Sequence, residues 1–389
     1  MPDVVPVRCS IMRGGTSKAV FFLENDIPAG REDRERMLLD VFGSPDVRQI
    51  DGLGGATSQT SKAALIGPPT RPDADVDYTF AQVVVTDSVV DWGGNCGNIS
   101  SAVGPFAIDA GLVRAVEGLT TVRIHNTNTA KIIVAHVPVE GGRAKTLGDH
   151  AIPGVPGTAA RILMEFTDPA GSTTGKLLPT GNTVDDITLA DGRTFQVSIV
   201  DAANPVVFFR ASDLGMTATE TWQEIEANLP VCDVLEEGRS IVCEMLGIVD
   251  DRRNATKVSP GLPKVGFVAP PTPYTNSVGE QVPADAMDLN GRLMSVQTAH
   301  RSYMTTGAVA TAAAAVIPGT IVHDVTRAGA DRPEADGIRI AHPYGVMGTV
   351  VRADYGQDGM PTLHGISVGR TARHILDGTV YVRKTALGG

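Results

Sequence analysis

The chain is poor in aromatic residues and in cysteine, and it has no long apolar run. Phe, Trp and Tyr make up 5% of its 389 residues, so small aliphatic side chains must fill the interior. The cysteines are few, and they form neither a CxxC pair nor a zinc-ligand spacing; they are Cys9, Cys96, Cys232 and Cys243. This pattern excludes zinc fingers and disulfide scaffolds, and it favours a reducing, cytoplasmic location.

Charge and hydropathy exclude two further classes of protein. The net charge is −11, and no run of five basic residues occurs, so the counterion-release signature of nucleic-acid binding is absent. The first 15 residues contain no apolar segment typical of a signal peptide. The longest apolar stretch, Ala308–Ile317, is too short to cross a bilayer. We therefore expect neither a nucleic-acid nor a membrane partner.

Short alternating or β-branched segments, bounded by turn residues, predict a strand-rich chain. These segments are Ala19–Leu23, Thr79–Val85, Thr121–Ile124, Lys131–Pro138, Phe195–Val200, Val206–Phe209 and Gly378–Arg383. Helical periodicity predicts helices at Glu32–Phe42, Glu220–Leu229, Ala286–Thr298 and Thr371–Leu376. Thr217 with Glu220 three residues later is typical of a capping box. The mixture predicts an α+β fold rather than a doubly wound parallel sheet.

Two further segments, 97–111 and 305–319, are small and apolar on nearly every side, which predicts helices enclosed on all faces. Because they lie about half a chain length apart, we interpret them as an internal repeat of two domains, each a sheet around one buried helix. The expected domains are 1–185 with a returning C-terminal strand at about 377–389, and 186–376. Two unrelated core helices are the alternative interpretation.

A buried helix start presents backbone N–H groups that have no partner within the helix. If two such starts face each other across a domain cleft, they form paired anion sites. Such a site would suit a substrate with two or three carboxylates, and it would let an acidic protein hold a polyanion.

Three glycine-rich polar segments in the first hundred residues carry the candidate chemistry. In 12–18, Arg13 offers a guanidinium fork beside a Gly-Gly-Thr-Ser turn, unless the segment is only a surface turn. The segment 51–62 lacks the glycine before Lys62 that a P-loop requires. Lys62 instead precedes a buried apolar run, where it can lose its proton and act as a general base; an ordinary surface lysine is the alternative.

The third segment, 91–98, places Cys96 directly before the first buried helix. A thiolate there is stabilised by the helix start, so Cys96 is a candidate acid/base or nucleophile. The other three cysteines are expected to be small core side chains. Among the histidines, we place only His300, just before the second buried helix, near a site.

The motifs 12–18, 51–57, 60–62 and 91–98 together resemble those of the PrpF family. Its members include 2-methylaconitate cis–trans isomerase, 3-methylitaconate Δ-isomerase and 4-oxalomesaconate tautomerase. The likeness recurs at 178–182, 268–271, 305–307 and 370–373, and so it covers nearly the whole chain. The resemblance implies a diaminopimelate epimerase-like fold, two similar domains with the active site in the cleft between them, and a homodimer.

The resemblance also implies allylic proton transfer in an unsaturated di- or tricarboxylate, with neither a metal nor an organic cofactor. Lys62 would be the base, and Cys96 its acid/base partner or a thiol that shapes the site. The expected carboxylate-binding residues, with Arg13 and His300, are Ser17, Lys18, Asn95, Gly97, Asn98, Thr305, Thr306 and Gly307. Asn204 resembles an Asn-Pro element near the epimerase site.

Several functions stay open at this level. Asp91-Trp92 and the segment 57–62 favour an aconitate or 2-methylaconitate type of substrate, whereas His300-Arg301 before a Thr-x-Gly helix start is more typical of the oxalomesaconate branch. A non-catalytic protein that binds a tricarboxylate would keep the helix starts without needing Lys62 or Cys96. A two-cysteine amino-acid epimerase is disfavoured because the second helix begins Thr305-Thr306-Gly307, with no cysteine.

Overall fold

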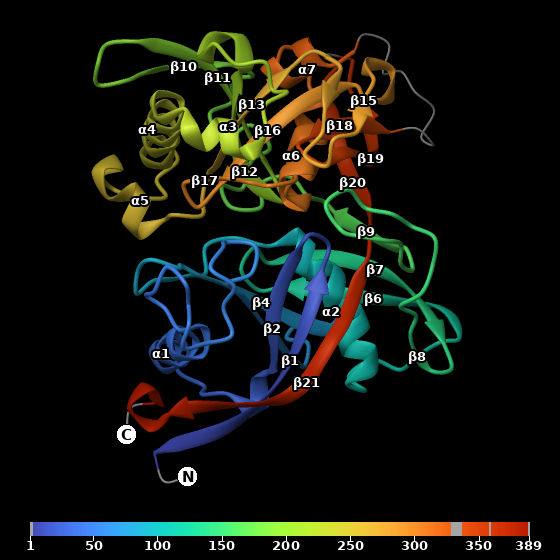
Figure 1. Ribbon diagram of the computed structural model, residues 1–389. Helices are drawn as coiled ribbons and strands as arrows, with labels where there is room; N and C mark the ends of the chain where they lie inside the picture. Colours follow the sequence, from blue (N-terminus) through green and yellow to red (C-terminus); the bar gives the residue numbers. More distant parts are fainter. Residues whose placement is uncertain (1–2, 328–336, 358, 388–389) are drawn as a thin grey trace. The chain divides into compact units, whose positions relative to one another are not determined.

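A computed structural model describes residues 3–327, 337–357 and 359–387. Its contacts divide the chain into two compact units: unit 1 is Met1–Met164 with Arg370–Gly389, and unit 2 is Glu165–Gly369 (Figure 1). These changeovers differ from the expected ones near 185 and 376. Residues 172–174 belong with unit 2 because the buried Asp201 carboxylate accepts hydrogen bonds from the backbone N–H groups of Thr173 (2.8 Å) and Thr174 (2.7 Å).

Unit 1 combines a mixed sheet with two helices. Its strands are β1 Val4–Gly14, β2 Ser17–Leu23, β3 Lys62–Gly67, β4 Val76–Val83, β5 Val90–Asp91, β6 Gly118–Asn126, β7 Lys131–Glu140, β8 Arg143–Ala144 and β21 Ala372–Arg383, with β9 Ile162–Thr167 at the changeover. Its helices are α1 Arg31–Phe42 and α2 Gly97–Asp109, with short 3-10 turns η1 Glu24–Asp26 and η5 Lys384–Leu387.

The strands of unit 1 pair in the order β21–β1–β2–β3–β4–β6–β7–β8. The steps β2–β3 and β4–β6 are parallel, and the others are antiparallel. The C-terminal β21 therefore lies beside β1, as the red and blue strands in Figure 1 show. The sheet curves round α2, which contacts strands from both ends of this order.

Helix α2 is the central element of unit 1, since the residues Gly97–Ile108 are all buried. Small side chains allow this enclosure: a Cβ on Gly104 would lie 2.8 Å from Val137 Cγ2, so only glycine lets the helix approach β7 this closely. Helix α1 covers the outer face with Met37, Leu38 and Phe42 buried at helical spacing. Burying each of these side chains contributes about 1.5–3 kcal/mol.

Unit 2 repeats this architecture. Its strands are β10 Asp185–Thr188, β11 Thr194–Ala202, β12 Asn204–Arg210, β13 Lys264–Ala269, β14 Tyr274–Thr275, β15 Gln281–Val282, β16 Leu289–Ser295, β17 Thr298–Ala299, β18 Ile338–His342, β19 Gly345–Tyr355 and β20 Pro361–Arg370. Its helical elements are η2 Ala211–Leu214, α3 Trp222–Ala227, α4 Leu229–Met245, η3 Arg252–Asn254, α5 Ala255–Val258, η4 Ala284–Ala286, α6 Thr305–Ala315 and α7 Ile321–Val325.

The pairing order of unit 2, β10–β11–β12–β13–β16–β18–β19–β20, has the same sequence of parallel and antiparallel steps as unit 1. Helix α4 follows the third strand of this order as α1 does in unit 1, and α6 occupies the place of α2 in the chain. Every residue of α6 is buried. The predicted internal repeat, each half with one enclosed helix, is confirmed.

The two enclosed helices and Glu32–Phe42 are confirmed, but three local predictions are wrong. Ala286–Thr298 contains β16, not a helix; all residues of this central strand are buried, so it lacks the alternation that marks a half-exposed strand. Thr371–Leu376 is the start of β21, held as a strand by its antiparallel pairing with β1. The capping box lies at Thr221 with Glu224, while the Glu220 carboxylate accepts from the Thr217 N–H without starting a helix.

Candidate functional site

Lys62 begins β3 in unit 1 and is 6% exposed. Its Nζ donates a hydrogen bond to Oε1 of Gln82 and lies 5.2 Å from the centre of the Phe80 ring. Burial lowers the pKa of the Lys62 ammonium, against the smaller opposite effects of Cys96 and Asp91. A buried lysine whose pKa is lowered in this way is a candidate general base.

Cys96 is the N-cap residue of α2, where the chain is extended and the side chain forms no capping hydrogen bond. Its thiol is half-buried. It lies close enough to Lys62 and Arg370 that its negative form raises the pKa of both cations. Cys96 therefore lies between the start of α2 and two buried cations, which makes it a candidate site residue.

A buried arginine, Arg370, lies against the same helix start. It is 1% exposed, and its Nη2 donates to the side-chain oxygen of Asn98, the second residue of α2. Its Nε has no hydrogen-bond partner, and no carboxylate pairs with it in the part of the chain that the structure describes. Burial lowers the pKa of Arg370 to about 10, with a further contribution from Arg13. A buried cation without a counter-ion is a candidate anion-binding group.

The turn between β1 and β2 fits closely over this pair. Gly15 has a φ of +51°, and a Cβ there would lie 2.2 Å from Asn98 Oδ1 and 2.7 Å from Arg370 Nη2. Ser17, which follows the turn, is 3% exposed, and its Oγ has no hydrogen-bond partner. Ser17 is thus a second buried polar group beside this turn, with a hydroxyl that can donate to an anion. We refer to Lys62, Cys96, Asn98 and Arg370 as the α2-start cluster.

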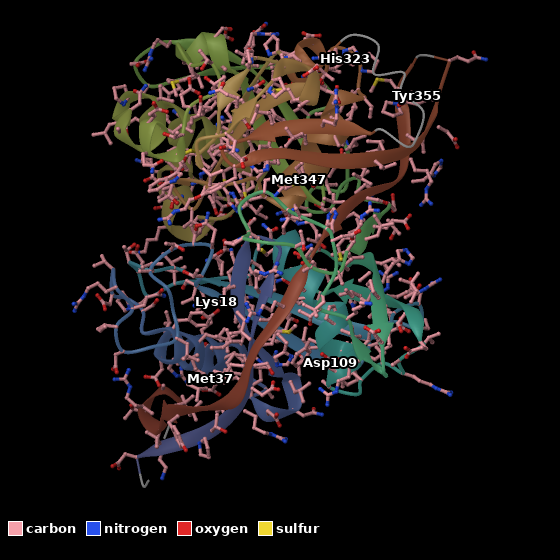
Figure 2. All side chains as sticks on the ribbon, turned by 45° about the vertical axis from the view of Figure 1, so that its right-hand side comes forward. Lys18, Met37, Asp109, His323, Met347 and Tyr355 are labelled. Atoms are coloured by element: carbon pink, nitrogen blue, oxygen red, sulfur yellow. The ribbon has the colours of Figure 1, made fainter. Side chains whose placement is uncertain are left out.

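The remaining predicted residues of unit 1 differ in their roles. Nη1 of Arg13 donates to the backbone oxygens of Gly15 (3.0 Å) and Thr371 (2.9 Å), so this nitrogen holds the turn against the start of β21. Lys18, labelled in Figure 2, is half-buried on β2, and its backbone N–H donates to the backbone oxygen of Gln59 at 2.9 Å.

Asn95 and Gly97 flank Cys96 and are both buried. The side-chain oxygen of Asn95 accepts from Ser100 Oγ at 3.1 Å, which links the loop before α2 to its first turn. Gly97 is the first residue of the helix, so its N–H belongs to the group without a partner inside the helix.

Unit 2 brings together its own predicted residues at the start of α6. Asn204 begins β12 and is fully buried, and its Nδ2 donates to Thr306 Oγ1 at 3.1 Å. Thr305 and Thr306 open the helix and are buried. Gly307 has a packing role, because a Cβ there would lie 2.3 Å from Leu293 Cδ1.

His300 lies four residues before α6 and is 4% exposed. Its Nδ1 accepts a hydrogen bond from the Ser302 N–H at 3.2 Å, which fixes this ring nitrogen as the unprotonated one. The His300 side chain therefore shapes the loop that leads into the helix start.

Two residues of the site are absent from the candidates that the sequence offers: Arg370, a member of the α2-start cluster, and Gln82, which contacts Lys62. Each reaches the site from a distant part of the sequence: Gln82 lies 20 residues from Lys62, and Arg370 lies 272 residues from Asn98. Arg370 belongs to a motif, 370–373, that carried the resemblance, and this was the one available signal. Gln82 had none, because it sits within an ordinary strand pattern.

The described residues contain neither a metal-ligand cluster nor a membrane-spanning helix. No group of three or more His, Cys, Asp or Glu side chains in residues 3–327, 337–357 and 359–387 could hold a metal ion. Within these same ranges, no helix has the length and apolar character needed to span a membrane.

Comparison with known proteins gives a family and a fold. The family model described as "PrpF protein" matches residues 4–383. The chain is 50% identical to the 3-methylitaconate isomerase of Eubacterium barkeri, covering 100% of both chains. It is 38% identical to the 2-methyl-aconitate isomerase of Shewanella oneidensis, covering 98% of both, and 39% identical to the 4-oxalomesaconate tautomerase of Pseudomonas putida, also covering 98% of both.

Among solved structures, the crystal structure of methylitaconate-delta-isomerase matches with a TM-score of 0.78 at 50% identity, covering 100% of this chain and 98% of that one. A hydroxyproline epimerase from Agrobacterium vitis matches with a TM-score of 0.56 at 10% identity, covering 99% and 95%. The second likeness shows a shared fold alone. Together they confirm the predicted epimerase-like α+β fold.

Proposed function

Because the chain belongs to the PrpF family and is an isomerase, we propose that it moves a double bond in an unsaturated di- or tricarboxylate by allylic proton transfer. The reaction would need neither a metal nor an organic cofactor. The observation that carries the proposal is the α2-start cluster, in which Cys96 lies near both a buried lysine with a lowered pKa and a buried arginine that lacks an acidic partner in the described ranges.

In the proposed first step, the neutral amine of Lys62 removes a proton from the carbon that lies next to both a carboxylate and the double bond. The C–H electron pair enters the π system and forms a dienolate, and Lys62 becomes an ammonium ion. In the second step, a proton is added at the far allylic carbon, and the double bond takes its new position. A positioned base of this kind contributes about 10²–10⁴-fold to the rate.

Negative charge grows on the carboxylate oxygens as the dienolate forms. Arg370 Nε, Ser17 Oγ and the first N–H groups of α2 are the donors proposed to bind that carboxylate. Donors aimed at developing charge in a buried site are each worth on the order of 3–4 kcal/mol. Asn98 would act through Arg370, whose guanidinium it orients.

Cys96 is proposed as the group that returns the proton or that shapes the site around the reacting carbons. It is half-buried at the helix start, near the cation that gains the proton in the first step. The remaining predicted residues are proposed to bind carboxylate groups directly or to hold those that do. They are Arg13, Lys18, Asn95, Gly97, Asn204, His300, Thr305, Thr306 and Gly307.

Within this substrate class, branched C4 backbones are the first candidates. 3-Methylitaconate has an acidic hydrogen on the carbon between one carboxylate and the C=CH₂ double bond, so proton transfer would convert the terminal methylene into a methyl group. The relative that bears this substrate's name is 50% identical, against 38% for the 2-methyl-aconitate isomerase. The oxalomesaconate tautomerase, 39% identical, supports 4-oxalomesaconate as the second candidate.

Proton NMR with chelator-treated enzyme tests the proposal. The enzyme is incubated separately with 3-methylitaconate, 2-methylaconitate, trans-aconitate and 4-oxalomesaconate. We expect migration or cis–trans conversion of the double bond with at least one of the four. A protein that binds these acids without changing any of them would contradict the proposal and favour a non-catalytic binding role. Light scattering and localisation by fractionation test the homodimer and the cytoplasmic location, which belong to the same proposal.

A further inference from the structure

The side chain of Gln82 forms the immediate surroundings of the Lys62 amine. Gln82 is 6% exposed, and its Oε1 accepts the hydrogen bond from Lys62 Nζ. Its Nε2 donates to the backbone oxygens of Ser61 (2.8 Å) and Ser58 (3.2 Å). Since those carbonyls can only accept, they fix which end of the amide faces the lysine. The amide oxygen, and not the amide nitrogen, therefore faces Nζ of Lys62.

This arrangement follows from the strand register. Lys62 and Gln82 are directly paired on the antiparallel strands β3 and β4, so their side chains are cross-strand neighbours. Asp91 of β5 pairs with Gln82 from the other side, and Cys96 approaches from α2. Both would favour the charged lysine, as would the Phe80 ring. The hydrogen-bond acceptor for Nζ in the described ranges is nevertheless the neutral amide of Gln82.

Unit 2 provides an internal comparison. The strand that pairs in parallel with β2 in unit 1, β3, and the strand that pairs in parallel with β12 in unit 2, β13, each begin with a lysine, Lys62 and Lys264. Continuing the β13–β16 register two residues beyond Gly266 puts Ser295 opposite Lys264. Lys264 is half-exposed, and serine is too short to copy the amide. The fold itself therefore does not require a glutamine at this position.

We propose that Gln82 is the positioning residue of Lys62: it holds the amine in place with a neutral acceptor and so leaves the lysine free to exist without its proton. This inference rests on the proposed role of Lys62 as the base. A carboxylate in the same place would also aim the amine, but it would stabilise the ammonium form and remove the base at neutral pH.

The proposal predicts that two substitutions of similar size differ in their effect on the pKa of Lys62. Gln82→Glu places a negative charge beside Nζ, and we expect the pKa of Lys62 to rise by about one to three units. Below the new pKa, the rate falls about tenfold for each unit of rise. Gln82→Met keeps the length but removes the acceptor, so we expect the pKa of Lys62 to stay low or to fall, while kcat drops and KM changes little.

The pKa of Lys62 can be measured without any substrate. The chain has eight lysines, so carbon-13 labelling of their Cε positions and NMR titration resolve them, and Lys62→Arg assigns the signal. Gln223→Glu on α3 is the matched control, because it adds the same charge at an exposed position in unit 2. Urea unfolding of each variant checks that the protein is folded under the conditions in which the pKa of Lys62 is measured. The kcat–pH profile with the best substrate is the second readout.

A rise in the Lys62 pKa with Gln82→Glu, no rise with Gln82→Met and no change in the control would support the proposal. An identical Lys62 pKa in all folded variants would overturn the proposal. A dependence of kcat on pH that is the same in Gln82→Glu as in the wild type would also overturn it. If the titration behaves as expected but no acid is turned over, the proposed function fails while the positioning role of Gln82 stands. If Gln82→Glu regains turnover at alkaline pH, its low activity at neutral pH comes from protonation of Lys62 and not from misfolding.

Discussion

Replacement of Arg370 by methionine should weaken carboxylate binding without lowering the free energy of unfolding. Arg370 is 1% exposed, and its Nε has no partner in the described ranges. A hydrogen bond to a charged group is worth about 1.5–3 kcal/mol. Losing it should therefore raise the dissociation constant of a dicarboxylate by about 10- to 150-fold.

The effect on stability has the opposite sign. Burial lowers the pKa of Arg370 to about 10 from its ordinary 12.5, which corresponds to about 3 kcal/mol against the charged form in the folded state. Because the folded pKa lies below the unfolded one, this cost is present at every pH below about 10 and is relieved only as the pH rises through that value. Loss of the hydrogen bond from the charged Arg370 to Asn98 costs at least about 1.5 kcal/mol. At neutral pH, Arg370→Met should therefore raise the free energy of unfolding by up to about 1.5 kcal/mol.

Two measurements on the ligand-free enzyme check this pair of effects. Calorimetric titration with methylsuccinate, which has no double bond to move, gives the affinity, and urea unfolding followed by circular dichroism gives the stability. Arg373→Met is the matched control, because Arg373 is exposed and only three residues away. A variant that binds methylsuccinate as tightly as the wild type and unfolds at lower urea concentration would show that Arg370 stabilises the fold and does not bind the carboxylate.

Three further predictions concern the two helix starts. Cys96 should react with iodoacetamide faster than the other three cysteines, whose pKa values are raised by burial, and a bound dicarboxylate should protect it; equal, unprotected labelling would count against the site. Gly15→Ala should destabilise by more than the roughly 1 kcal/mol expected for Gly142→Ala, since both have positive φ but only the first meets the Asn98 side chain; equal urea midpoints would contradict this. Thr306→Val removes a buried hydroxyl at the α6 start and should raise KM by about tenfold; a change in Tm alone would leave this helix start without a binding role.

The sequence predicts those parts of the fold whose signals are local. The enclosed helices were predictable because each carries small apolar residues on nearly all of its faces, and the distance between them along the chain revealed the repeat. Helix α4 was missed although it is the longest helix of the described chain, because its charged residues and Pro230 obscure the periodicity. Strand β16 was taken for a helix because full burial removes the alternation that identifies strands.

The candidate site divides in the same way. Lys62 and Cys96 are recognisable because each stands at the boundary between a polar glycine-rich segment and a buried one. Gln82 and Arg370 are not, because their importance comes from pairing between strands and from burial far along the chain. Gly307 shows the converse: its place at a helix start predicts binding, whereas its contact with Leu293 gives it a packing role.

Isotope exchange is the direct test of Lys62 as the base that moves an allylic proton. Wild-type enzyme and Lys62→Ala are incubated with 3-methylitaconate in D₂O, and proton NMR follows the hydrogen next to the carboxylate, while calorimetry with methylsuccinate follows binding. We predict exchange and double-bond migration with the wild type, and neither with the variant, whose affinity stays within about tenfold, or 1.4 kcal/mol. Exchange that persists in Lys62→Ala would contradict the assignment of Lys62 as the base.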